Sequence, residues 1–215
     1  MDRQRHGLHH RPVEILRRAL HRAGWHRRDL GCLHDHRHRF FGAGGAAAIT
    51  AGVDGVFASS GPDTAGVIVK QIREAGLALP ILAGDGFDTD LLVSVPGPTL
   101  ATNVYFTNHA YVGLETGPAD TFRAAYEAEY GRPPENAFAA LGYDAMGLVA
   151  DAITRAGSSD PKAVSAALAA TSNYADAVTG AIAYIDGSRV PSKRVAIMQV
   201  DAGKITLNTT VTPRS

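Results

Sequence analysis

Residues 53–61 read Val-Asp-Gly-Val-Phe-Ala-Ser-Ser-Gly, and residues 80–86 read Pro-Ile-Leu-Ala-Gly-Asp-Gly. Each stretch is a short apolar run that ends in small polar residues, the pattern of a buried strand followed by a loop. Between them, Pro62 opens a predicted helix that reaches about Ala75, because Val67, Ile68 and Ile72 fall on one face. This strand–helix–strand order predicts an α/β fold with a parallel sheet flanked by helices.

The loops after these two strands are the candidate binding residues. In open parallel sheets, ligands bind at the carboxyl ends of the strands, and the chain places Ser59, Ser60 and Asp85 there. Structural interpretations remain open for each of them. Ser59 and Ser60 could cap the helix that begins at Pro62, and Asp85 with Gly86 could form only a turn.

The pattern continues as helices and strands to the end of the chain. Asn136 is a predicted N-cap, and Asp160 is another, followed by Pro161 at the first helical position. Tyr143 lies on the helix that Asn136 opens and is a weaker candidate for ligand contact than for core packing. Helices are predicted over 62–75, 89–95, 121–130, 137–156 and 161–170, and strands over 53–58, 80–84, 103–107, 179–185 and 195–200.

Charge divides the chain into two pieces. Residues 1–40 hold ten arginines and eight of the nine histidines against four acidic residues, a net charge of +6. The remaining residues hold 11 basic and 17 acidic groups, a net charge of −6. The total of zero argues against a protein that binds nucleic acid over its whole surface.

The basic segment allows several interpretations. The histidines between His34 and His38 could bind a metal, the arginines could bind phosphates, or the segment could be a targeting leader. Arg, His, Gly and Ala runs are also what GC-rich coding DNA yields when it is read out of frame. We favour that origin and predict that 1–45 is an aberrant segment without a metal or nucleic-acid role.

Composition also argues against an enzyme. One cysteine, Cys32, excludes a disulfide framework, and no apolar run reaches the roughly 18 residues that span a bilayer. The sequence contains no Gly-x-Ser-x-Gly elbow, no phosphate-binding P-loop and no His-Glu-x-x-His motif. We therefore predict no catalysis, no cofactor, no metal and no membrane insertion. The alternative is a small α/β enzyme that uses Asp85 and His109, and it is supported only by the presence of those two residues.

Several motifs in this order resemble one known family. They are residues 54–58, 69–77, 80–86, 124–134, 139–145 and 178–187, with the turn at 201–204. Together they resemble the second lobe of periplasmic leucine/isoleucine/valine-type binding proteins of ABC transporters, over about residues 46–210. The resemblance implies a type I periplasmic-binding-protein fold, in which two α/β lobes hold an amino acid or similar small solute. It also implies an ABC permease as partner and a periplasmic location.

The resemblance further implies roles for single residues and for segments. Asp85 matches the acidic partner of the ligand's ammonium group, and the small polar loop at Ser59 and Ser60 departs from the aromatic residues of leucine-type binders. Residues 46–107 with 190–210 correspond to the second lobe, and 108–189 to part of the first. The sequence lacks a signal peptide and the first-lobe half that precedes this point, so as given it would remain cytoplasmic.

Two functional expectations follow from this incomplete match. The first-lobe helices would leave an apolar face exposed, and the chain would bind its family's solute poorly or not at all. The alternative to a solute-binding component is a ligand-sensing regulatory domain of the same fold. That alternative needs a DNA-binding or membrane segment, and residues 1–40 contain no helix-turn-helix pattern.

Overall fold

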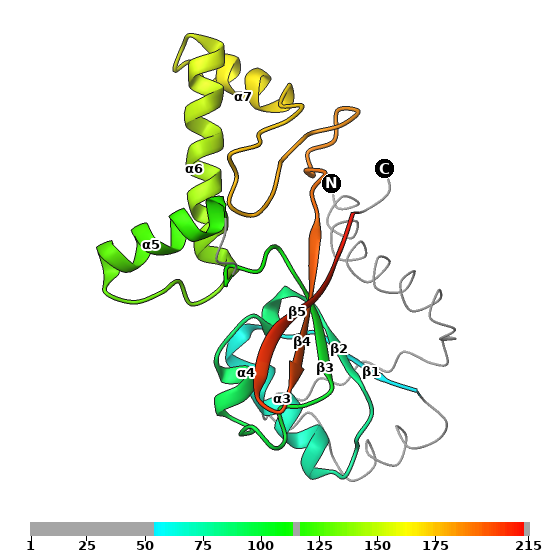
Figure 1. Cartoon of the computed structure of the whole chain (residues 1–215). Helices are drawn as coiled ribbons and strands as arrows, with labels where there is room; N and C mark the ends of the chain where they lie inside the picture. Colours follow the sequence, from blue (N-terminus) through cyan, green and yellow to red (C-terminus); the bar gives the residue numbers. More distant parts are fainter. Residues whose placement is uncertain (1–53, 114–116, 213–215) are drawn as a thin grey trace. The chain divides into compact units, whose positions relative to one another are not determined.

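The computed structural model describes residues 54–113 and 117–212 (Figure 1). The predictions for the basic segment 1–45 and for its histidines, and the first residue of the strand predicted over 53–58, lie outside the described residues. The chain divides into two compact units. One runs through Thr107 and includes Gln199–Thr206, and the other comprises Asn108–Met198 and the segment from Leu207. The assignment of these parts to two lobes stays a prediction.

A five-stranded sheet has the order β1-β2-β3-β4-β5 (Figure 1). β1 pairs in parallel with β2, and β2 pairs in parallel with β3, which confirms the predicted parallel arrangement. Its core includes side chains with no exposed surface, among them Ile81, Val104 and Phe106. The strands are β1 (Val56–Ala58), β2 (Ile81–Ala83), β3 (Val104–Asn108), β4 (Val195–Asp201) and β5 (Lys204–Val211).

Helix α3 (Pro62–Glu74) connects β1 to β2. Its buried residues Ala65, Ile68, Val69 and Ile72 recur at helical spacing, so burial of this face drives the helix onto the rest of the unit. Gly66 allows a close approach to α4 (Leu91–Ser94), because a Cβ at this glycine would lie 2.0 Å from the Leu91 carbonyl oxygen.

Arg73 ties three parts of this unit together. Its guanidinium donates to the carbonyl oxygens of Leu77 and Leu79, which precede β2, at 2.7 and 2.9 Å. It also donates to those of Thr102 and Asn103, which precede β3, at 2.7 and 3.2 Å. Burial lowers the pKa of Arg73, and these carbonyls compensate for water lost from the cation.

Three helices dominate the second unit: α5 (Pro118–Tyr130), α6 (Ala137–Ala156) and α7 (Pro161–Ala169). The predicted caps are confirmed. The Asn136 side chain accepts from the backbone N–H of Phe138, and Asp160 accepts from those of Lys162 and Ala163. Gly157 ends α6 in the left-handed conformation that glycine adopts without steric cost.

The strand predicted over 179–185 is wrong. This region contains only isolated bridges, Tyr174 to Ile182 and Ala183 to Ser192. The backbone N–H groups of Val178 and Thr179 bond instead to a carboxylate of α6, so they do not enter a strand ladder.

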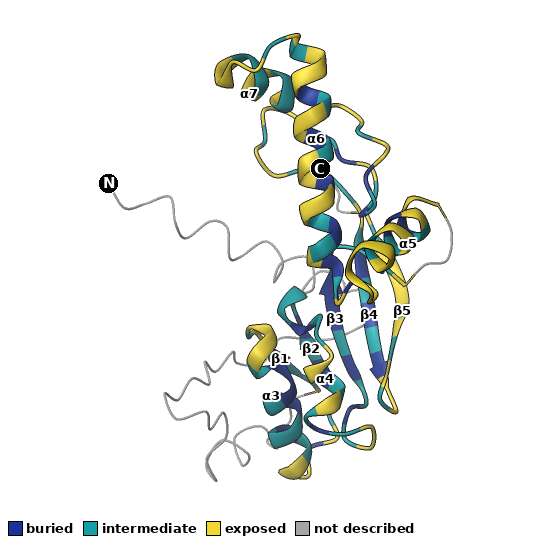
Figure 2. Cartoon of the chain, turned by 90° about the vertical axis from the view of Figure 1, so that its left-hand side faces the viewer, coloured by how far each residue is buried: buried dark blue, intermediate teal, exposed yellow. Residues whose placement is uncertain are grey.

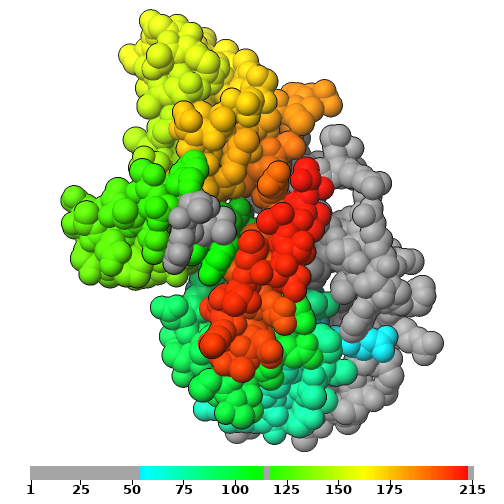
Figure 3. Space-filling view, viewed as in Figure 1, coloured from blue at the N-terminus to red at the C-terminus, as the bar shows by residue number. Residues whose placement is uncertain are grey.

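β5 was not predicted, and it forms one edge of the sheet. Its residues, red in Figure 3, lie at the surface of the view shown there. Its exposed and half-buried residues largely alternate, and Thr and Asn hold most of its exposed positions. The turn from β4 to β5 uses Ala202 and Gly203, both with positive φ, the geometry of a two-residue hairpin turn.

Helix α6 carries apolar side chains on two opposite faces. One face, with Ala140, Leu148 and Ala152, is buried. The opposite face leaves Tyr143 and Met146 exposed, and Figure 2 colours several stretches of the α6 ribbon yellow, for exposed residues. The predicted exposed apolar helix face is therefore confirmed. By length and composition α6 could cross a membrane, a test that the core helix of a soluble protein also passes.

Candidate functional site

The candidate site is built from the loops that follow β1 and β2. The parallel register pairs Ala58 with Ala83, the last residues of the two strands. The loop Ser59-Ser60-Gly61 therefore leaves the sheet beside the loop Gly84-Asp85-Gly86, at the same carboxyl edge. This confirms the placement that strand–helix–strand connectivity predicted.

The two loops are in direct contact through Gly86. A Cβ on this residue would lie 2.0 Å from the carbonyl oxygen of Ser60 and 3.6 Å from the Cα of Gly61. Only glycine allows the backbones to approach this closely. The contact fixes the distance between the loop that holds the serines and the loop that holds Asp85.

The serines do not cap helix α3. Gly61 is the N-cap residue, and the helix has no side-chain cap hydrogen bond at its start. The hydroxyl of Ser60 donates to the carbonyl oxygen of Gly61, and Ser59 is exposed. The capping interpretation of Ser59 and Ser60 is thus contradicted. Their hydroxyls lie at the surface of the carboxyl edge.

Asp85 begins a short 3-10 turn, Asp85–Phe87. The turn is anchored by Phe87, which has no exposed surface, and it closes through a bond from the Asp88 N–H to the Asp85 carbonyl oxygen. The carboxylate of Asp85 is half-buried. Asp85 is part of a turn, as one interpretation predicted, but that turn holds its side chain at the edge where the two loops meet.

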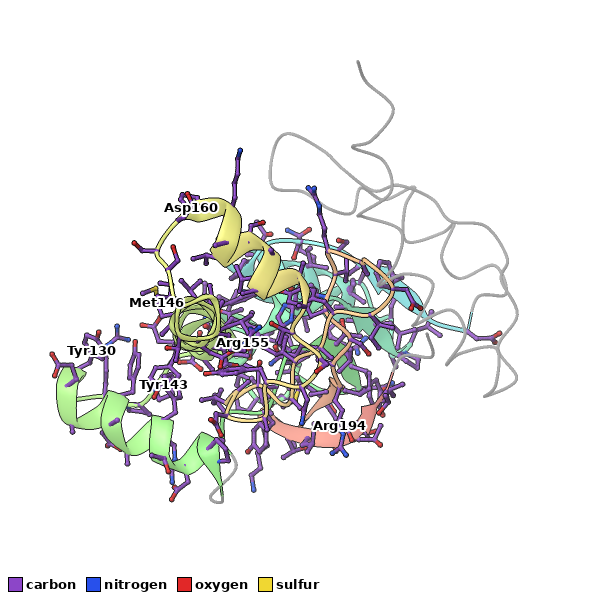
Figure 4. The ribbon with its side chains drawn as sticks, turned by 90° about the horizontal axis from the view of Figure 1, so that it is seen from above. Tyr130, Tyr143, Met146, Arg155, Asp160 and Arg194 are labelled. Atoms are coloured by element: carbon purple, nitrogen blue, oxygen red, sulfur yellow. The ribbon has the colours of Figure 1, made fainter. Side chains whose placement is uncertain are left out.

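Tyr143, the fourth candidate, belongs to the second compact unit. Its ring packs on Phe122 of α5 at a centroid distance of 5.2 Å, and 58% of the residue is exposed. Figure 4 looks along α6 and shows Tyr143 and Met146 on one side of the helix, with Arg155 on the other. Tyr143 is therefore a surface residue, and the expectation that it packs in the core is wrong.

Asp144, the neighbour of Tyr143, is a polar site that the sequence did not single out. It is 2% exposed, and its carboxylate accepts from the backbone N–H of Val178 at 2.7 Å and of Thr179 at 2.9 Å. The Thr179 hydroxyl also donates to it, and Lys193 donates to that hydroxyl. One signal could have found it, because Asp144 lies at helical spacing between Ala140 and Leu148 on the buried face.

Other polar candidates have structural partners. The ring of His109 packs edge-on against Phe138 at 5.9 Å, in line with a structural role. Within the part of the chain that the structure describes, no three His, Cys, Asp or Glu side chains form a group able to hold a metal ion. The site at the carboxyl edge thus offers hydroxyls and a carboxylate, a set that suits hydrogen bonding to a cationic or polar solute.

Comparison with known proteins gives the same fold. The family model described as periplasmic binding protein matches residues 41–204. A leucine-binding protein, LivK from Thermotoga maritima, superposes with a TM-score of 0.69 and 29% identity over 78% of this chain. The substrate-binding protein LivJ from Streptococcus pneumoniae, solved with isoleucine, gives 0.67 and 28% over 80%.

A more distant neighbour has a different ligand. The solute-binding protein from R. palustris solved with benzoate has a TM-score of 0.64 and 22% identity over 80% of this chain, a likeness of fold alone. The matches cover 47%, 48% and 47% of these three structures, so the chain spans about half their length. Among curated proteins, none matches the chain.

Proposed function

This chain belongs to the periplasmic binding protein family, and on that basis we propose that it supplies one wall of a solute site in the binding component of an ABC importer. The observation that carries the proposal is the contact of the Asp85 loop with the serine loop through Gly86, at the carboxyl edge of parallel strands. An ABC permease is the partner and the periplasm is the location that this function requires.

The solute we propose is an amino acid or a related small molecule with a cationic group. The Asp85 carboxylate receives the ammonium group, because a charge-assisted hydrogen bond in a half-buried position is strong and directional. Ser59 and Ser60 bond to polar groups of the same solute.

We propose that the chain by itself binds weakly. It spans 47% of the leucine-binding structure that it matches, so about half of that structure has no counterpart in this chain. A solute on an open wall keeps much of its water, and a cleft that buries most of the ligand supplies most of the affinity. We expect dissociation constants on the order of millimolar rather than micromolar.

The test is a titration of the full chain with a panel of amino acids, benzoate and glucose, followed by the backbone amide signals of Gly84 and Gly86. We expect amino acids to shift these signals with weak affinity and Asp85→Asn to abolish the shift. Asp54→Asn is the matched control, because Asp54 is exposed and precedes β1, at the opposite end of that strand. The absence of any shift at about 10 mM, or an unchanged response in Asp85→Asn, would overturn the proposed wall. A micromolar constant would overturn only the weak binding.

A further inference from the structure

Aspartate is followed by glycine at residues 54–55, 85–86 and 186–187. In such a pair the backbone nitrogen of the glycine can reach the side-chain carboxyl carbon of the aspartate, and the glycine has no side chain to hinder the approach. The pair at 54–55 borders residues that the structure does not describe. The structure therefore compares the pair at 85–86 with the pair at 186–187.

Asp186 and Gly187 form the tip of an exposed turn. Both residues are exposed, and both have positive φ, 53° and 69°, the combination found in a type I′ turn. The turn is closed by a bond from the Ser188 N–H to the Ile185 carbonyl oxygen at 2.9 Å. The left-handed conformation is less favourable for aspartate than for glycine, and exposed loop tips open locally at low cost. The backbone at Asp186 can therefore rotate within the folded chain.

Asp85 and Gly86 lie in a packed turn instead. Both are half-buried, and the next residue, Phe87, has no exposed surface. The Asp88 N–H bonds to the Asp85 carbonyl oxygen at 3.0 Å. A Cβ on Gly86 would lie 2.0 Å from the carbonyl oxygen of Ser60, so this backbone has little room to rotate. The contact between the two loops holds Asp85 in place.

We infer that Asp186 is a site of spontaneous isomerisation to isoaspartate. The backbone nitrogen of Gly187 attacks the side-chain carboxyl carbon of Asp186 and loses its proton, and a carboxyl oxygen leaves as water. The new C–N bond closes a cyclic succinimide. Water then adds to one of the two ring carbonyls. Cleavage of the new C–N bond restores aspartate, whereas cleavage of the original peptide bond leaves the main chain running through the side-chain carbon. One water is released and one is consumed, so the chain keeps its composition.

The modified turn differs from the original one in length and charge position. Isoaspartate adds a methylene to the main chain and leaves a carboxylate on the Cα. The lengthened turn joins the two residues of an isolated bridge, Ala183 and Ser192, whose backbone bonds measure 2.7 and 3.4 Å. The carboxylate on the Cα is the group that isoaspartate-specific methyltransferases esterify with S-adenosylmethionine. This inference is independent of the proposed solute site.

The test stores the folded full chain at neutral pH for weeks and then digests it with trypsin. An isoaspartate-specific methyltransferase with labelled S-adenosylmethionine detects the product. Asp186 lies in the tryptic peptide 163–189 and Asp85 in the peptide 74–123. We expect at least about tenfold more label in 163–189, because an exposed turn opens more readily than a packed one. When the chain is stored in concentrated urea, the two peptides should be labelled to a similar extent, because the fold that distinguishes them is lost.

Two variants assign the label to a residue. Asp186→Glu should remove it from the peptide 163–189, because a glutamate side chain must close a larger and less favourable ring. Asp176→Glu is the matched control and should leave the label unchanged. Asp176 is exposed in the same peptide, but it precedes Ala177, whose side chain hinders the attack and which is 3% exposed. Label that persists in Asp186→Glu would overturn the inference. Equal labelling of the two peptides in the folded chain, or labelling of 163–189 in urea alone, would overturn it too.

Discussion

The carboxylate of Asp144 accepts both the backbone N–H of Thr179, at 2.9 Å, and the Thr179 hydroxyl, at 2.6 Å, across 35 residues of sequence. The pair fastens an irregular segment to α6. That segment has no strand ladder to hold it, only isolated bridges. The buried carboxylate thus supplies hydrogen bonds to the backbone of this segment, as a neighbouring strand does within the sheet.

Removing this acceptor should destabilise the second unit. Asp144→Ala leaves buried N–H groups and the Thr179 hydroxyl without their partner, and each lost partner costs roughly 1–3 kcal/mol. We expect the free energy of unfolding to fall by about 3 kcal/mol in urea denaturation. Asp151→Ala, which breaks the i,i+4 pair with Arg155 near the surface, should cost less than about 1 kcal/mol. Equal losses in the two variants would contradict the role of Asp144.

Gly86→Ala should disturb the contact between the loop at Ser59 and Ser60 and the loop at Asp85. The added Cβ would lie 2.0 Å from the Ser60 carbonyl oxygen, so one loop must move, at a cost of about 1–3 kcal/mol. Gly84→Ala is the matched control, because a Cβ there meets nothing within 4 Å. Thermal unfolding measures the cost, and amide shifts at Ser59 and Ser60 report the movement. Small effects of both variants would show that the loops do not depend on each other.

Arg73→Met should destabilise the first unit through its backbone. It leaves the carbonyl oxygens of Leu77, Leu79 and Thr102 without the guanidinium that they bind. We expect a loss of about 2–4 kcal/mol in urea denaturation. Arg132→Met removes a cation from a surface pair with Glu135 and should change stability by less than about 1 kcal/mol. If Arg73→Met lowered the free energy of unfolding no more than Arg132→Met does, water would be able to replace the N–H groups of Arg73 as hydrogen-bond donors to these carbonyl oxygens.

Lys193 predicts a pH dependence of stability. Burial lowers its pKa, although Asp144 acts in the opposite direction. Between this lowered value and the ordinary value of 10.5, the unfolded chain binds more protons than the folded one, so the free energy of unfolding rises with pH. Burial raises the pKa of Tyr174, so above pH 10 the titration of this tyrosine opposes the rise.

The measurement is urea denaturation at a series of pH values below 10, the ordinary pKa of tyrosine. Lys193→Met should flatten the rise, because it removes the group whose proton affinity differs between the folded and unfolded states. Lys204→Met, at an exposed position on β5, should leave the slope unchanged. A rise that persists in Lys193→Met would assign the pH dependence to another group.

Local signals explain what the sequence predicted. Asn136 and Asp160 are cap residues, and they confirmed two helix starts because capping depends only on residues two or three positions away. The positions of the two candidate loops were predicted for a similar reason, since each loop follows a short apolar strand. Their contact through Gly86 was not predicted, because it depends on the register of β1 against β2.

Long-range partners explain what the sequence missed. The strand expected over 179–185 failed because Thr179 bonds to Asp144, and no local pattern connects those residues. β5 was not predicted because it lies at the edge of the sheet with solvent on one side. Its polar Thr and Asn residues therefore interrupt the apolar run that indicates a buried strand. Tyr143 was expected to pack in the core, since an apolar helix is normally covered on every side.

The short parallel strands β1 and β2 form the sheet, and the candidate site residues lie in the loops that follow them. β1 and β2 have three residues each, and their pairing ends at Ala58 and Ala83. In the proposed solute site, the side chains at this edge that contact the solute all follow those two alanines in the sequence. Under the proposed function, replacing both loops while keeping the glycine at position 86 should change which solute binds and leave the pairing of β1 with β2 intact.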